Sequence, residues 1–137
     1  MTRLTLFALV AALQCAAACS APPPPPPPSS AALMEPIRSA IGDAACEQSD
    51  QCRVLPVGNK PCGGPNGYLA WSTQATDANA LQAAALAQAA AERRENATSG
   101  MRSTCNIVPA PSASCRPSVS DGRKTCQLDP AGRRGLD

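Results

Sequence analysis

The chain of 137 residues contains no histidine, and it has only one phenylalanine, one tyrosine and one tryptophan. Histidine is the usual general base and the commonest metal ligand at neutral pH, so its absence excludes Ser-His and Cys-His catalysis. The formal net charge is only +2, with no basic stripe and almost no aromatic surface on which bases could stack. We therefore expect a protein that is not an enzyme and does not bind nucleic acid.

Large apolar side chains are also scarce. Beyond the first 18 residues the only aromatic residues are Tyr68 and Trp71, and the hydrophobic share of 44% depends largely on alanine, which buries little area. A domain of this size is only marginally stable on core packing alone. Small domains with thin cores usually need a further source of stability, and the cysteines of this chain are the candidate.

The first 18 residues have the order of an export signal. Met1–Arg3 supplies a short positive start, Leu4–Leu13 is an apolar run, and the small residues Ala16–Ala18 follow. This order is typical of a secretory signal peptide. The apolar run is too short to cross a bilayer, which takes about 20 residues. We therefore expect residues 1–18 to be removed during export.

The residues at the end of this signal resemble a lipobox. Ala16-Ala17-Ala18-Cys19 is similar to the cleavage site of bacterial lipoproteins, in which the cysteine becomes the first mature residue and carries lipid. The resemblance implies lipid attachment at Cys19. The sequence departs from the family at Ala16, where leucine is usual. Ordinary cleavage after Ala18 or Ala21 stays open as the alternative.

A proline-rich tether follows, over residues 19–30. Seven consecutive prolines, Pro22–Pro28, adopt a polyproline II helix and span about 22 Å, so the segment serves as a stiff spacer. Ser20, in place of aspartate after the lipid cysteine, resembles an outer-membrane sorting signal. The resemblance implies a cell-envelope protein that reaches the membrane through its lipid anchor, with the outer membrane favoured.

The cysteines form an even set once the signal is removed. Cys15 leaves with the signal and Cys19 takes lipid, so the remaining residues form three disulfides in an oxidising compartment. They are Cys46, Cys52, Cys62, Cys105, Cys115 and Cys126. No two of them have the Cys-x-x-Cys spacing of zinc sites and thiol oxidoreductases. We expect no metal and no cofactor.

The expected fold class is α+β, a small disulfide-braced domain over residues 31–128 in which one long helix packs on a short antiparallel sheet. The clearest helix covers residues 77–99, with Thr76 or Asp77 as its cap and Gly100 at its end. A weaker helix, interrupted by Pro36, is expected over residues 31–41. Strands are expected at residues 52–57, 68–72, 104–108, 114–116 and 124–128, and a flexible tail at 129–137.

The disulfide pairing has fifteen possibilities for six cysteines. Ser120–Arg123 is a hairpin turn sequence, and it would place Cys115 and Cys126 opposite each other on the two strands. On this basis we favour a Cys115–Cys126 pair.

Three sequence features suggest ligand sites but are better explained as structure. Gly63–Gly67 lacks the Lys-Ser/Thr of a phosphate-binding loop, so we interpret it as a turn. The acidic residues Asp43, Glu47 and Asp50 do not have EF-hand spacing, so we interpret them as a solvated loop. Trp71 is interpreted as a core residue rather than part of a ligand platform. We therefore predict no catalytic residues and no metal ligands.

Several short motifs together resemble a group of small secreted cysteine-rich bacterial proteins of unknown function. The motifs are Asp50-x-Cys52-Arg, Cys62-Gly-Gly-Pro, Tyr68-x-x-Trp71-Ser72, a helix, Ser103-Thr104-Cys105 and two late cysteines. The resemblance covers residues 46–126, and Cys-Gly-Gly-Pro is its most specific element. It implies a shared fold and supplies no catalytic residues.

Three functional hypotheses follow. The leading one is a non-enzymatic, lipid-anchored envelope protein that binds or organises a partner at the membrane surface, such as another envelope protein. The alternative is a secreted protease-inhibitor-like module that presents the loop from Val57 to Asn66. The third, an enzyme that uses carboxylates or Lys60, has no support from residue spacing.

Overall fold

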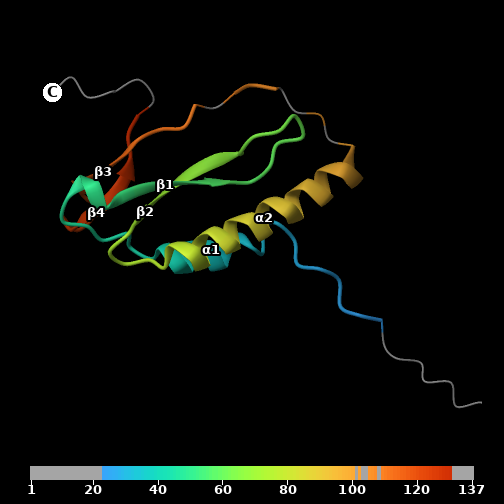
Figure 1. The fold of residues 1–137 in the computed structure, drawn as a ribbon, viewed down its shortest axis with the longest axis horizontal. Coiled ribbons are helices and arrows are strands. Elements are labelled where there is room, and N and C mark those ends of the chain that lie inside the picture. The colour runs from blue at the N-terminus through green and yellow to red at the C-terminus, as the bar shows by residue number, and fades with distance from the viewer. Residues whose placement is uncertain (1–22, 101, 103–104, 108, 131–137) are drawn as a thin grey trace, which may run out of the picture.

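The computed structural model describes residues 23–100, 102, 105–107 and 109–130, and it confirms a small α+β domain (Figure 1). The helices are α1 (Met34–Ile41), a single 3-10 turn η1 (Ser49–Gln51) and α2 (Ala78–Ser99). The strands are β1 (Cys52–Val57), β2 (Gly67–Ser72), β3 (Ala113–Pro117) and β4 (Lys124–Leu128). The predicted signal peptide and Cys19 lie outside the described residues, as do the last seven residues of the predicted tail.

The strands form two antiparallel pairs in place of one sheet. In the first hairpin, β1 pairs with β2 so that Leu55 lies opposite Leu69 and Arg53 lies opposite Trp71. In the second hairpin, β3 pairs with β4. The first hairpin lies along α2, while the second packs at the other end of the domain, beside the start of β1 (Figure 1).

The residues at the ends of α1 and α2 are compatible with the helix boundaries. Pro36 is the third residue of α1, and the amide of a third helical residue has no partner within the helix, so the proline removes no hydrogen bond. The expected start of this helix at residue 31 was wrong, because residues 31–33 form a turn. Asp77 caps α2 by accepting hydrogen bonds from the amides of Asn79 and Ala80, and Gly100 ends the helix with φ 62°.

The core lies between the two α-helices and the first hairpin. Ile37 from α1 and Leu81 from α2 are completely buried, and Leu55 and Val57 pack against them from β1. The other buried apolar residues are Ile41, Ala44, Ala85, Ala91 and the cysteines Cys46, Cys52 and Cys126. With so few large side chains, the domain depends on sulfur as well as on apolar burial, as its composition predicted.

Three disulfides are present, but the pairing expected across the second hairpin was wrong. The pairs are Cys46–Cys115, Cys52–Cys126 and Cys62–Cys105, with Cα–Cα distances of 6.0, 5.4 and 5.5 Å. Cys115 and Cys126 do lie opposite each other in the register of β3 and β4. Each, however, bonds to a cysteine near the start of β1, so two disulfides fasten the second hairpin to the rest of the domain.

Two further expectations differ from the structure. Residues 105–107 form no strand, although a strand was expected over 104–108; residues 104 and 108 lie outside the described part. Asp129, the first residue of the expected tail, is held in place: it accepts hydrogen bonds from Ser112 Oγ and Ser114 Oγ, and it pairs with Arg116 at 3.5 Å.

Candidate functional site

A groove of about 440 Å³ runs between α2 and the first hairpin. Its walls are mainly apolar. From the hairpin and its loop they comprise Val54, Leu55, Pro56, Gly58, Asn59, Gly64, Pro65 and Trp71; from α2 they comprise Ala78, Leu81, Gln82, Ala85, Leu86, Ala89 and Arg93. A mainly apolar hollow with a few polar groups is the usual character of a ligand site.

The α2 wall follows from the spacing of small residues along the helix. Ala78, Leu81, Ala85 and Ala89 recur at intervals of three or four, so they share one face. Leu81 is completely buried and forms the floor, whereas the alanines are too short to fill the space in front of them. Leu86 stands at the margin with 66% of its surface exposed. The hollow therefore exists because alanine occupies positions where a core helix usually has larger residues.

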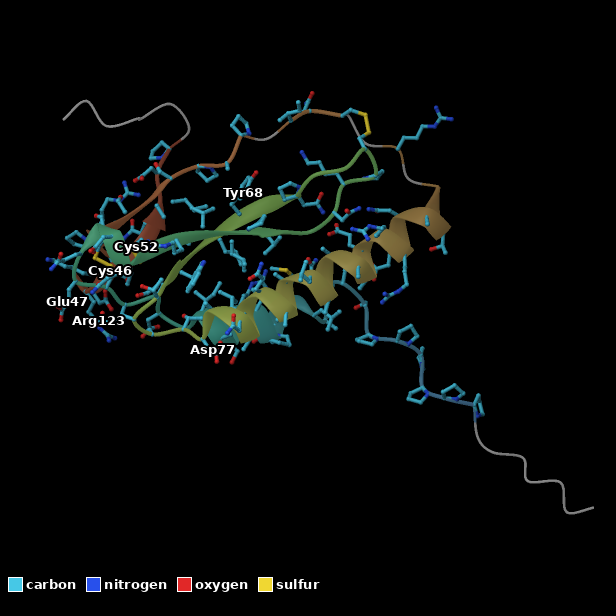
Figure 2. The ribbon with its side chains drawn as sticks, viewed as in Figure 1. Cys46, Glu47, Cys52, Tyr68, Asp77 and Arg123 are labelled. Atoms are coloured by element: carbon cyan, nitrogen blue, oxygen red, sulfur yellow. A yellow bond between two sulfur atoms is a disulfide. The ribbon has the colours of Figure 1, made fainter. Side chains whose placement is uncertain are left out.

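Trp71 supplies the largest side chain of the hairpin wall. Residues directly opposite each other in an antiparallel pair point to the same face, and so do residues two positions apart along a strand. The pairs Arg53–Trp71 and Leu55–Leu69 therefore share the face on the α2 side. Tyr68 lies on the other side of the hairpin (Figure 2). Trp71 packs against the core and is half-buried, and it also lines the groove. The prediction of a core residue thus describes only part of its position.

The loop between β1 and β2 closes one end of the groove and is held tightly. The Gly58 amide donates to Gln88 Oε1 at 2.8 Å, and the Asn59 amide donates to Glu92 Oε2 at 2.8 Å. Asn96 Nδ2 donates to the Asn59 carbonyl at 2.6 Å, and the Asn66 side-chain amide donates to Glu92. Side chains of α2 therefore fix the loop that borders the groove.

The tip of this loop is covalently tied to the segment that follows α2. Cys62 pairs with Cys105, and Lys60 Nζ donates to the Asn106 carbonyl at 2.9 Å. The Lys60 amide bonds to the Gly64 carbonyl, which makes the Cys-Gly-Gly-Pro element a compact turn, as expected for Gly63–Gly67. The Lys60 ammonium is thus held by a backbone carbonyl of the segment that follows α2.

Arg93 is the only charged residue among those that line the groove. Its guanidinium lies 3.5 Å from Asn59 Oδ1, a long contact, and no carboxylate of the described residues lies within ion-pair distance of it. The neighbouring carboxylate of Glu92 is directed to the loop amides instead. The closed end of the groove therefore carries one positive charge.

The sulfur atoms of Cys46, Cys52 and Cys126 lie within 4.8 Å of one another and would resemble a metal site if they were thiols. All three are in disulfides, so none offers a thiolate to a metal ion. Figure 2 shows Cys46 and Cys52 together at the end of the domain that carries the second hairpin. Of the acidic residues considered above, Asp43 pairs with Arg123 at 3.5 Å in an exposed position.

The tether meets α2 at its C-terminal end. The Ser30 hydroxyl donates to Glu95 Oε2 at 2.5 Å, and the Ser30 amide donates to Glu95 Oε1 at 2.7 Å. The hydroxyl bond, and then the amide bond, lower the pKa of the Glu95 carboxyl below its ordinary value of 4.5. The tether therefore leaves the domain beside the C-terminal half of α2, as Figure 1 shows.

Comparisons with known proteins give no further assignment. No family model matches the chain, and neither a curated protein nor a solved structure is similar to it. Among the described residues, no helix has both the length and the hydropathy needed to cross a bilayer.

Sequence reasoning identified the helix face but not the groove. The shared face of Ala78, Leu81, Ala85 and Ala89, with Leu86 at its margin, is visible in the sequence, and its small side chains predict close packing of the helix against a sheet. The sequence does not reveal that few large apolar side chains lie opposite that face, chiefly Leu55, Leu69 and Trp71. Small residues on both sides leave space between helix and hairpin.

Proposed function

We propose that the protein is an exported, lipid-anchored component of the cell envelope whose domain binds a ligand without catalysing a reaction. The observation that carries this proposal is the groove between α2 and the first hairpin, which is bordered by a loop fixed by side chains and a disulfide. A binding surface fixed in advance loses little conformational freedom when its ligand arrives. The catalytic alternative has little support, because the groove contains no acid-base pair.

The signal, Cys19 and the tether supply the location in this proposal. Residues 19–30 would hold the domain off the outer membrane, and the contact between Ser30 and Glu95 fixes the end of the tether against α2. Disulfides persist outside the cytoplasm, so the three pairs in the domain agree with export.

Intact-mass spectrometry of the membrane fraction, with and without reduction, tests this location. We expect a mature chain that begins at Cys19, carries lipid on that residue and holds six oxidised thiols. A Cys19→Ala variant should appear without lipid in the soluble fraction, while Ser20→Ala serves as the matched control and stays anchored. A wild-type chain that retained residues 1–18, or lacked lipid, would contradict the anchor.

The protease-inhibitor hypothesis is a second candidate because of one observation. The loop of residues 58–66 is held by Gln88, Glu92 and Asn96 and by the Cys62–Cys105 disulfide, and inhibitory loops need such rigidity. We expect any inhibition to depend on residues 61–64, the exposed tip. No inhibition of a broad protease panel at micromolar concentration would remove this candidate.

A further inference from the structure

We propose that the groove binds an anionic amphiphile, a molecule with one aliphatic chain and a carboxylate or phosphate head. This inference rests on the binding role proposed above and names the ligand chemistry. It combines two features of the groove: an apolar channel along α2 and an uncompensated positive charge at its closed end.

The channel suits a single extended chain. Its α2 wall runs from Ala78 to Arg93, four turns that span about 22 Å at 1.5 Å per residue. Trp71 and the three leucines of the lining are the largest apolar side chains along this length. The volume of about 440 Å³ falls within the range of roughly 300–1,000 Å³ that is typical of small-molecule sites.

The charge selects the head group. Arg93 lines the groove and has no carboxylate partner among the described residues, so an incoming anion displaces no ion pair. Guanidinium groups form paired hydrogen bonds with carboxylate and phosphate oxygens, and such bonds are stronger than neutral ones. A cationic head would meet Arg93 with like charge. The groove therefore discriminates between ligands by the sign of the head-group charge.

The loop residue next to this charge is itself held in place. Asn59, whose Oδ1 lies beside Arg93, has its own amide held by Glu92 and its carbonyl held by Asn96. The Glu92 carboxylate accepts hydrogen bonds from the Asn59 amide and the Asn66 side chain, and it forms no ion pair with Arg93. The loop wall at the head-group end is therefore fixed before a ligand arrives, and the rest of the channel imposes few polar requirements.

Trp71 makes binding directly measurable, because it is the only tryptophan in the chain and it lines the groove. The full chain carrying Cys19→Ala would be titrated with laurate, dodecyl phosphate, dodecanol and dodecyltrimethylammonium, each below its micelle concentration. We expect the two anions to change Trp71 emission saturably, with the cation and the alcohol at least about tenfold weaker. Acetate and inorganic phosphate, which lack the chain, should have no effect.

Matched variants locate the site. Arg93→Gln should weaken binding of the anions about tenfold and leave dodecanol unchanged, whereas Arg94→Gln, which alters a neighbouring arginine outside the groove, should leave both unchanged. Ala89→Phe should block the channel, while Ala87→Phe on the exposed face should not; urea unfolding verifies that both remain folded. If laurate and the cation bound equally, or if Arg93→Gln and Arg94→Gln behaved alike, the assignment would be overturned.

The location and the ligand can fail separately. Intact-mass analysis reports the lipid on Cys19 and is independent of the groove, while the fluorescence titration uses a chain without the anchor. An anchored protein with no Trp71 response to either anion would overturn the ligand assignment and leave the proposed location standing. A Trp71 response in a chain that is never acylated would support the ligand assignment and overturn the proposed location.

Discussion

Gln88 is a polar side chain in the core, with only 4% of its surface exposed, and its role is to fix a loop. Its Oε1 accepts the Gly58 amide at 2.8 Å, and its Nε2 lies 3.4 Å from Glu92 Oε2. A buried polar group is stable only when its hydrogen bonds are made. The pairing of Gln88 with Gly58 therefore specifies where β1 ends and where the groove closes.

We expect Gln88→Leu to lower the free energy of unfolding by about 1–3 kcal/mol, because the Gly58 amide would lose its acceptor in a partly buried position. Urea unfolding followed by circular dichroism measures this change. Gln82→Leu, on an exposed position of the same helix, is the control and should stay within about 0.5 kcal/mol of wild type. Equal stability of the two variants would contradict the role of Gln88.

Glu95 provides a pH-dependent contact at the tether. Because the hydrogen bonds from Ser30 lower its pKa in the folded protein, the contact is complete above the ordinary value of 4.5 and is lost as the pH falls through the lowered pKa. NMR titration of the Glu95 carboxyl should show a midpoint below 4.5. Ser30→Ala removes the larger cause and should move the midpoint back toward 4.5, while Ser29→Ala should leave it unchanged.

The loop between β1 and β2 shows how a backbone conformation depends on its surroundings. Gly58 and Gly63 both have positive φ, 81° and 88°, a region that other residues occupy only with strain. The two glycines differ in the space available for a Cβ atom. A Cβ added at Gly58 would lie 2.7 Å from both Asn66 Cβ and Glu92 Oε2, whereas nothing lies within 4 Å at Gly63.

We therefore expect Gly63→Ala to cost about 1–2 kcal/mol from backbone strain alone. Gly58→Ala should cost more, because the Glu92 side chain must also move and the loop amides would lose their acceptor. Urea unfolding gives the stabilities, and amide exchange at Asn59 shows the loosened loop. A smaller loss for Gly58→Ala than for Gly63→Ala would contradict this account.

The elements of regular structure could be predicted well from local chemistry. β1 has the predicted bounds, and α2 runs to Ser99 as expected, because Asp77 and Gly100 are strong end signals. The strand expected around Cys105 was wrong at residues 105–107. β-Propensity alone does not form a strand, and the strand pairs of the described residues are β1 with β2 and β3 with β4.

The disulfide pairing could not be predicted from local chemistry because it depends on tertiary contacts. Cys115 and Cys126 are opposite in the hairpin, as the turn sequence predicted. However, β4 also pairs on its other edge: the Cys46 amide donates to the Lys124 carbonyl, and the Cys126 amide donates to the Ala44 carbonyl. This contact between segments almost 80 residues apart brings Cys46 and Cys52 to the hairpin.

At the scale of the whole molecule, disulfides connect the two hairpins where apolar contact is limited. The pairs Cys46–Cys115 and Cys52–Cys126 close 69 and 74 residues of sequence, and Cys62–Cys105 closes 43. In the chain-entropy description, loops of these lengths each contribute about 4 kcal/mol. The chain-entropy contributions of the three disulfides are therefore nearly equal. The burial of the cysteines decides which disulfide stabilises the domain most.

We expect the double variant Cys52→Ala/Cys126→Ala to be less stable than Cys62→Ala/Cys105→Ala. Both residues of the first pair are buried in the core, so their removal also leaves a cavity, whereas both residues of the second pair are exposed. Thermal unfolding and secreted yield measure the difference, with about 2–5 kcal/mol lost for a single disulfide. The opposite order of stability would show that the exposed bridge is the more important one.

The two bridges to the second hairpin also determine what a protease would release. Every peptide bond between Pro109 and Ser112 lies inside the segment that both Cys46–Cys115 and Cys52–Cys126 span. A nick there would divide the polypeptide yet leave both pieces covalently joined, and the mass would change only by one water. Such damage would stay invisible on a non-reducing gel and separate into two bands once reductant is added.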